Sequence, residues 1–279
     1  MKQLLKHVVL LGFLLAFLFS NQVLAQTIEP PVEKVVRNTS NIQSEYGSGF
    51  GFNVAMNNFG FNVGGEYRKV VGPSTELMTS IRIGGLRDAS EQTFTDYLFG
   101  QQIIPNKYQR AFAFPLLIGL RHRLFTDMIQ ENYRFFVSAS MGPALAFSFP
   151  YFDDTNDNGY REQFSNFYEP VNDIFTGWSE GDWHMGGTGE IKLALDIGGN
   201  FSRLNSVEFG YFFYYFPDGL QLMMPNQPIP LPNPGPGQFP YETYPPGHPM
   251  EGDLILEPSF EDQTFFGSPQ ITFTFGWLW

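Results

Sequence analysis

Large apolar side chains recur at every second position along much of this chain, and this spacing is the strongest constraint on its fold. In the final stretch ITFTFGWLW, one face carries Ile271 and four aromatic residues, and the other carries mainly small or polar residues. Alternate side chains of a β-strand point to opposite faces, so a period of two predicts a strand. The same alternation predicts eight strands, near residues 49–56, 59–68, 76–83, 112–124, 133–147, 190–197, 207–215 and 265–279.

The connections between these segments alternate in length. The first two strands are joined by Asn57 and Asn58, a two-residue hairpin signal that predicts Met56 and Phe59 as cross-strand neighbours. The second, fourth and sixth links (VVGPS, TDMIQEN and FSRLN) are short. The third, fifth and seventh links are long loops at about 87–109, 149–185 and 217–264. Short turns at one end and long loops at the other are typical of small membrane-spanning β-barrels.

The less apolar face of the predicted strands carries charges of both signs among Gly, Ala and Ser. The interior of an eight-stranded barrel is just wide enough for side chains, and near balance of charge avoids unpaired buried ions. A soluble β-sandwich would show the same alternation with its charges in water, so it stays open as an alternative. The charges expected inside a barrel are Glu66, Arg68, Glu76, Arg82, Arg121, Arg123, Arg134, Glu190, Lys192, Asp196 and Glu208.

The N-terminal residues have the pattern of an export signal. Lys2 and Lys6 precede the apolar run VVLLGFLLAFLF, and VLAQ follows, which predicts a signal peptide at 1–25 cleaved after Ala25. The run is shorter than the roughly 20 residues that a membrane-spanning helix needs. The predicted organisation continues with a periplasmic lead-in at 26–46 and a barrel at 47–279. The chain contains no cysteine, so no disulfide framework is expected.

The signal peptide, the eight alternating segments and the aromatic last strand together resemble small Gram-negative outer-membrane β-barrel proteins of the porin-like or OmpX-like kind. The resemblance covers 49–279 as a pattern and implies an eight-stranded antiparallel up-and-down transmembrane barrel in contact with outer-membrane lipids and lipopolysaccharide. It also implies that the last strand is read by the outer-membrane assembly machinery, although Trp stands where a terminal Phe is more usual. The residues implied in closure and assembly are Phe273, Phe275, Trp277 and Trp279.

The last two long loops carry the negative charge of the chain. Removal of Lys2 and Lys6 with the signal takes the formal charge from −12 to −14, and the segments 149–185 and 217–264 account for −7 each. The plain interpretation is a solvated, soluble surface. The alternative is an acidic crown that collects divalent cations. Nucleic acid is not expected as a partner, because its binding depends on Lys and Arg.

Two loop motifs have specific implications. The stretch DTNDNG predicts a calcium loop, with Asp154, Asn156, Asn158 and Glu162 at positions one, three, five and nine. Position twelve is Ser165, where such a loop has a bidentate Glu, and Asp, Asn and Gly also form ordinary turns. No other cofactor is predicted. The stretch PNQPIPLPNPGPGQFPYETYPPGHP predicts an extended or disordered outer loop.

The preferred function is a non-enzymatic structural or surface-interaction barrel with a filled lumen, and no catalytic residue is assigned. A narrow porin-like pore would need more strands, for which DIFTGW and DLILEPSF are candidates. An outer-membrane lipid-modifying enzyme would need a base near the outer rim. Only His184, next to Asp182 and Trp183, and His248 are placed in loops that reach that rim.

Overall fold

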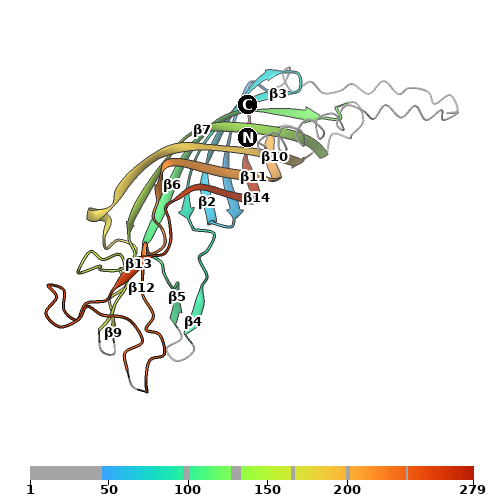
Figure 1. The fold of residues 1–279 in the computed structure, drawn as a ribbon. Helices are drawn as coiled ribbons and strands as arrows, with labels where there is room; N and C mark the ends of the chain where they lie inside the picture. The colour runs from blue at the N-terminus through green and yellow to red at the C-terminus, as the bar shows by residue number, and fades with distance from the viewer. Residues whose placement is uncertain (1–45, 97–100, 127–132, 165–166, 199–201, 237) are drawn as a thin grey trace, which may run out of the picture. The chain divides into compact units, whose positions relative to one another are not determined.

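The eight predicted segments form one closed antiparallel barrel in the computed structural model (Figure 1). The order around the barrel is β1-β14-β11-β10-β7-β6-β3-β2, so each strand pairs with its neighbour in sequence and β14 closes onto β1. This confirms the predicted all-β, eight-stranded up-and-down barrel, and the soluble β-sandwich is wrong. The strands are β1 (Ser48–Asn57), β2 (Gly60–Gly72), β3 (Thr75–Leu86), β6 (Gln109–Leu124), β7 (Tyr133–Pro150), β10 (Asp182–Ile197), β11 (Arg203–Leu220) and β14 (Gln263–Leu278).

The structure describes residues 46–96, 101–126, 133–164, 167–198, 202–236 and 238–279. The predicted signal peptide, the lead-in up to residue 45 and most of the fourth link lie outside these residues. Within them, no helix is long and apolar enough to cross a membrane.

The barrel has two different ends. The end that holds the β2–β3, β6–β7 and β10–β11 connections and the C-terminus is called the turn end here. The opposite end, called the loop end, holds the three long connections and the tight β1–β2 turn. Short elements lie in the long connections: β4 (Phe94–Asp96), β5 (Gln101–Ile103), β8 (Gln163–Phe164), β9 (Phe167–Tyr168), the 3₁₀ helix η1 (Trp178–Glu180), β12 (Asn226–Pro228) and β13 (Leu256–Pro258).

The barrel strands extend further toward the loop end than predicted. β10 begins at Asp182, so His184 lies in a strand and not in the loop where the sequence placed it. β11 runs to Leu220 and β14 begins at Gln263. The alternation weakens in these extensions because glycines and inward-facing aromatics interrupt it. The predicted strands therefore ended before the observed strands did.

The first hairpin corrects one predicted contact. Met56 pairs with Phe61, and the turn residues are Asn58 and Phe59. Phe59 is consequently not in the outward apolar row. Its ring packs against Tyr214 and Phe266, with ring centroids 6.4 and 6.3 Å away. The side chain amide of Asn57 accounts for the shift, because its oxygen accepts a hydrogen bond from the Phe59 N–H at 2.9 Å.

The candidate extra strands do not enter the barrel. DLILEPSF contributes β13, which pairs only with β12 outside the barrel. DIFTGW forms no strand. The proline-rich segment is also more ordered than predicted, because isolated bridges join Pro230 to Tyr241 and Thr243 to Leu254. The order in this segment comes from backbone pairing across it, and its own sequence does not indicate that pairing.

Candidate functional site

The interior of the barrel holds a charged layer, made of the eleven residues predicted there. All eleven side chains are buried. Glu190 lies on its loop-end side and accepts two hydrogen bonds from the Arg82 guanidinium, at 2.7 and 2.9 Å. Lys192 Nζ lies 2.9 Å from Glu190 and 2.6 Å from Glu208. Opposite charges at these distances offset the cost of removing each ion from water.

A second group of ion pairs lies closer to the turn end. Arg121 binds the carboxylate of Asp196 with both terminal nitrogens and stacks over the Phe136 ring at 3.7 Å. Arg68 contacts Glu66 at 2.5 Å, Glu76 at 3.7 Å and Glu208 at 3.5 Å. Glu208 thereby connects the two groups. The network is continuous across strands from both halves of the barrel.

Apolar side chains fill the interior on both sides of the charged layer. Toward the turn end, Val70, Leu204 and Leu278 form a small cluster. Toward the loop end lies a larger cluster, called the aromatic plug here, in which the Tyr214 ring stands edge-on to Phe212 at 4.6 Å. The sequence did not predict this plug, because its aromatics occur on the face assigned to small and charged residues. Its members are Leu86, Ala111, Ala113, Leu117, Ala144, Ala146, Phe212, Tyr214, Phe216, Leu220, Leu222 and Phe266.

The outward face of the barrel has the opposite polarity. Large apolar side chains point away from the interior on every strand, and Ile191 and Leu193 of β10 are 64% and 60% exposed. Aromatic residues gather toward both ends of this face. Those near the turn end include Phe50, Tyr67, Tyr133, Trp277 and Trp279, and those near the loop end include Phe61, Phe114, Trp183, Tyr211 and Phe265.

The last strand closes the barrel through the residues predicted for it. Val54 pairs with Phe273, Phe52 with Phe275 and Phe50 with Trp277. The Trp279 carbonyl accepts hydrogen bonds from the N–H groups of Gly47 and Ser48 at 3.0 and 3.1 Å. The closure function of this strand is therefore visible in the structure. Its recognition by assembly machinery stays a prediction.

The three long connections join one another above the aromatic plug. The N–H of Tyr108 donates to the Leu222 carbonyl at 2.9 Å, and that of Met224 donates to the Asn106 carbonyl at 2.7 Å. The N–H of Tyr151 in turn donates to Tyr108 at 2.8 Å. Tyr151, Phe152 and Met224 form a buried cluster at these connections. The three connections are thus bonded to one another at the loop end.

A buried ion pair holds the first of these connections. Lys107 Nζ lies 2.7 Å from a Glu91 oxygen, and both side chains are buried. Burial lowers the pKa of Lys107, and the neighbouring Glu91 carboxylate opposes that shift. No sequence pattern indicated this pair, because its partners are far apart and lie in an irregular segment.

We expect Glu91→Gln to release this connection. Lys107 would then keep its charge in a buried site without the Glu91 carboxylate. Removing one partner of a fully buried ion pair costs about 3–5 kcal/mol of stability, and the cost of removing Glu91 is smaller than this. Trypsin cleavage after Lys107 should speed up by about tenfold, which corresponds to 1.4 kcal/mol of easier local opening. The control is Glu261→Gln, which removes an exposed carboxylate, and unchanged cleavage in Glu91→Gln would contradict the role of the pair.

The predicted calcium loop is a hydrogen-bonded turn. The Asp154 carboxylate accepts the N–H groups of Asn158 at 3.1 Å and Gly159 at 2.8 Å. Asn156 and Asn158 both donate side-chain hydrogen bonds to Glu162, at 3.3 and 2.6 Å. Desolvation raises the pKa of Asp154. Among the described residues no group of three or more His, Cys, Asp or Glu is placed to hold a metal ion, and calcium binding stays a prediction.

The histidines named from the sequence have separate surroundings. His184 Nε2 lies 2.9 Å from the Ser148 hydroxyl, which is itself buried. His248 stacks on Tyr244 with ring centroids 4.3 Å apart and accepts the Met250 N–H. Only the first arrangement has the distance of a nucleophile and its base.

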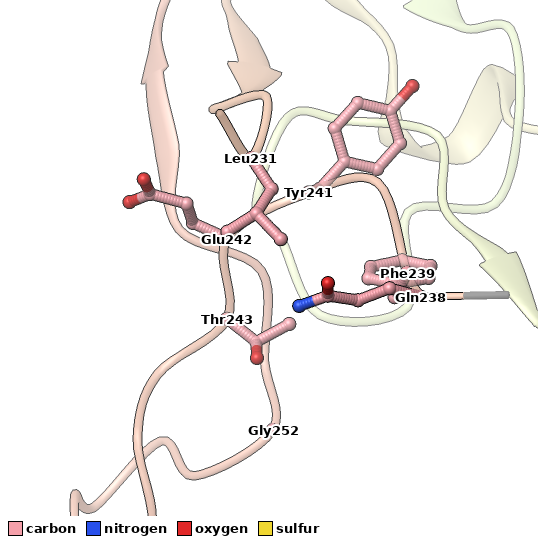
Figure 2. A pocket seen from close by; sticks show the side chains of 7 residues that line it. All are labelled: Leu231, Gln238, Phe239, Tyr241, Glu242, Thr243 and Gly252. Carbon is pink, nitrogen blue, oxygen red and sulfur yellow. The ribbon is translucent and has the colours of Figure 1, made fainter. Parts of the chain in front are cut away.

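A cavity of about 640 Å³ lies in the proline-rich segment. Figure 2 shows that Leu231 and Thr243 line it together with Phe239, while the Glu242 carboxylate points to the side opposite the Phe239 ring. Polar groups do not converge on one point there. The cavity therefore does not define a ligand.

The fold and interior place this chain among closed, side-chain-filled eight-stranded antiparallel β-barrels. The structure is similar to that of Ail, the attachment invasion locus protein of Yersinia pestis, with a TM-score of 0.31 and 7% identity over 83% of this chain and 95% of that one. At these values the similarity carries no argument about function. No protein-family model and no curated protein sequence matches the chain.

Proposed function

We propose that this chain is an integral outer-membrane β-barrel protein with a filled lumen, acting as a structural or surface-interaction protein through its acidic outer loops. The observation that carries the proposal is the inverted polarity of the barrel. Eleven ionisable side chains are buried inside, and the outward face carries large exposed apolar side chains on every strand. An exposed apolar face of this extent is costly in water and favourable in a bilayer.

The arrangement of the ends supports an orientation. Small outer-membrane barrels have short periplasmic turns and long outer loops, with aromatic girdles at both interfaces. The turn end would then face the periplasm and the bonded loops would face outward. Lipids and lipopolysaccharide are the proposed partners of the wall, and the outer-membrane assembly machinery is the proposed partner of the β14 end. Nucleic acid is not a proposed partner.

Electrophoretic mobility tests the proposal directly. The protein should be recovered from an outer-membrane fraction and should run as a compact, faster band when it is not boiled. Boiling should remove that band, because heat opens a closed barrel that mild detergent leaves intact. Recovery in the soluble periplasmic fraction without a mobility shift would overturn the proposal.

The filled lumen predicts a lack of permeation. Charged side chains, the aromatic plug and the bonded loops lie one above another along the barrel axis, and eight strands leave no open channel. Vesicles containing the protein should therefore retain a small sugar as well as protein-free vesicles do. Rapid swelling in an isotonic sugar solution would favour the narrow porin-like pore instead.

A lipid-modifying enzyme is the second candidate, favoured by the 2.9 Å contact between Ser148 and His184. The Ser148 side chain is almost fully covered, and both of its strand neighbours pair with it through the backbone. We therefore assign the contact a structural role. Covalent labelling of the wild-type protein by a fluorophosphonate, lost in Ser148→Ala, would support the enzyme.

A further inference from the structure

A short segment of the fifth link packs against the outside of the barrel. This segment, called the wedge here, comprises residues 171–181 and includes η1. The Trp178 ring lies 6.3 Å from Phe147 and 6.1 Å from Phe149, both on the outward face of β7. Phe149 is completely covered by its neighbours, although its strand position points outward. The wedge therefore covers the barrel wall at the loop end.

Several contacts fix the wedge in place. Arg110 of β6 donates two hydrogen bonds, at 2.8 and 2.9 Å, to the carbonyls of Asn172 and Asp173. The Asp173 carboxylate accepts the N–H groups of Phe175 and Thr176, each at 2.7 Å. The bonds from Thr176 and Phe175 lower the pKa of Asp173, so the carboxylate that holds this turn is ionised at neutral pH.

Glycine allows the close approach to the wall. A Cβ on Gly181 would lie 2.3 Å from the Phe147 ring. Gly177, just before η1, has φ 88°, a left-handed conformation that glycine adopts without strain. Both positions are where the chain turns against β7. The wedge thus has a defined conformation against the outward face of β7.

The wedge presents apolar side chains that nothing in the described protein covers. Phe175 is 71% exposed, and Ile174 and Val171 are also exposed. Phe175 contacts Trp178 with ring centroids 5.2 Å apart. Trp183 of β10 continues the same surface, 4.9 Å from Phe147. The exposed surface therefore runs without interruption from the wedge into the outward face of the barrel.

The height of the surface along the barrel matches a bilayer boundary. Phe135, near the turn end of β7, and Phe147 lie 12 positions apart on the same face. At about 3.3 Å per residue and a tilt of about 40°, this separation is roughly 30 Å along the axis, against an apolar band of about 25 Å. Phe147 and the wedge thus fall at the far boundary of the band, where aromatic side chains concentrate in membrane proteins.

We propose that the wedge is a lipid-surface anchor, which inserts Ile174, Phe175 and Trp178 at the boundary between the headgroups and the acyl chains of the outer leaflet. The inference rests on the proposed membrane location and names the part of the outer loops that contacts the lipid. Its continuity with the apolar wall favours lipid over a second copy of the chain. A second copy would also bring the carboxylates of Asp173, Glu180 and Asp182 against their own counterparts.

Tryptophan quenching in vesicles tests the anchor. The chain has four Trp, so single-Trp variants that retain Trp178, Trp183 or Trp277 can be reconstituted in phosphatidylcholine vesicles with bromine near either the headgroup or the acyl-chain end. Trp178 should be quenched by the shallow bromine and much less by the deep one. Trp277, in the aromatic group of the turn end, serves as a positive control.

A paired variant tests the wedge itself. Ile174→Ser with Phe175→Ser should lower the shallow quenching of Trp178 by about half or more, because interfacial anchoring scales with buried apolar area. The band that shifts on boiling should be unchanged. As a matched control, Thr176→Ser in the same turn should leave the quenching unchanged.

The outcomes separate the two proposals. Quenching of Trp183 and Trp277 without quenching of Trp178, together with access of Trp178 to aqueous acrylamide, would overturn the anchor and leave the membrane barrel intact. Protection of Trp178 from both quenchers would also overturn it and would indicate a protein partner or a second copy. Absence of lipid quenching at all three positions, with no mobility shift on boiling, would overturn the membrane proposal itself.

Discussion

Glu190→Ala is expected to destabilise the barrel by about 3–5 kcal/mol, the range for breaking a buried ion pair by removing one partner. Arg82 loses both of its hydrogen bonds to Glu190 in this variant, at 2.7 and 2.9 Å, and Lys192 loses one of its two carboxylate neighbours. The hydrogen bonds from Ser140 and Gln270 to Glu190 are lost as well. The measurement is the urea midpoint of the band that shifts on boiling.

Two further variants show whether charge or packing is responsible. Arg82→Met combined with Glu190→Leu removes both members of the pair and should cost less than Glu190→Ala, because neither ion is left unpaired. Glu261→Gln removes an exposed carboxylate and should have little effect. Equal midpoints for Glu190→Ala and the wild type would show that the charged layer does not stabilise the barrel.

Gly276→Val is expected to prevent closure of the barrel between β1 and β14. A Cβ at Gly276 would lie 2.1 Å from the Phe50 carbonyl oxygen and 2.5 Å from the Gly51 Cα. These are backbone atoms of the pairing strand, so they cannot move without loss of the strand hydrogen bonds. We expect the compact unboiled band to be lost, since at the proposed membrane location an unpaired edge would leave several costly polar groups unsatisfied.

The matched control is Gly187→Val in β10. A Cβ at this strand glycine would have only the Gly142 carbonyl oxygen within reach, at 3.9 Å. The variant should retain the band that shifts on boiling, because valine suits an open strand position. A compact band in Gly276→Val with wild-type stability would contradict the importance of the close approach at the seam.

The sequence alone indicated the barrel because period-two alternation is a local property of each strand. Each segment repeated it, and the alternating link lengths indicated the topology. The interior charges could be named for the same reason, since the odd or even position of a residue along a strand decides which face its side chain lies on. Which ions pair could not be predicted. Arg82 and Glu190, for example, come from strands far apart in sequence and meet only when the barrel closes.

The errors occurred where local pattern and tertiary contact disagree. Phe59 was predicted to pair with Met56, but it lies in the turn, where its N–H donates a hydrogen bond to the Asn57 side-chain oxygen, and it packs beside the aromatic plug. His184 was assigned to a loop because the glycines of 186–189 hid the first part of β10. The proline-rich segment was expected to be extended or disordered, yet bridges across it give it structure.

The sequence by itself determined the strands, their two faces and the side of the sheet that carries charge, because these follow from backbone geometry at each residue. Only the tertiary structure decided how the lumen is filled, how the three long connections bond to one another and where the wedge lies. Those features depend on contacts between residues distant in the chain, and such contacts form only once closure of β14 onto β1 has fixed the strands around one axis.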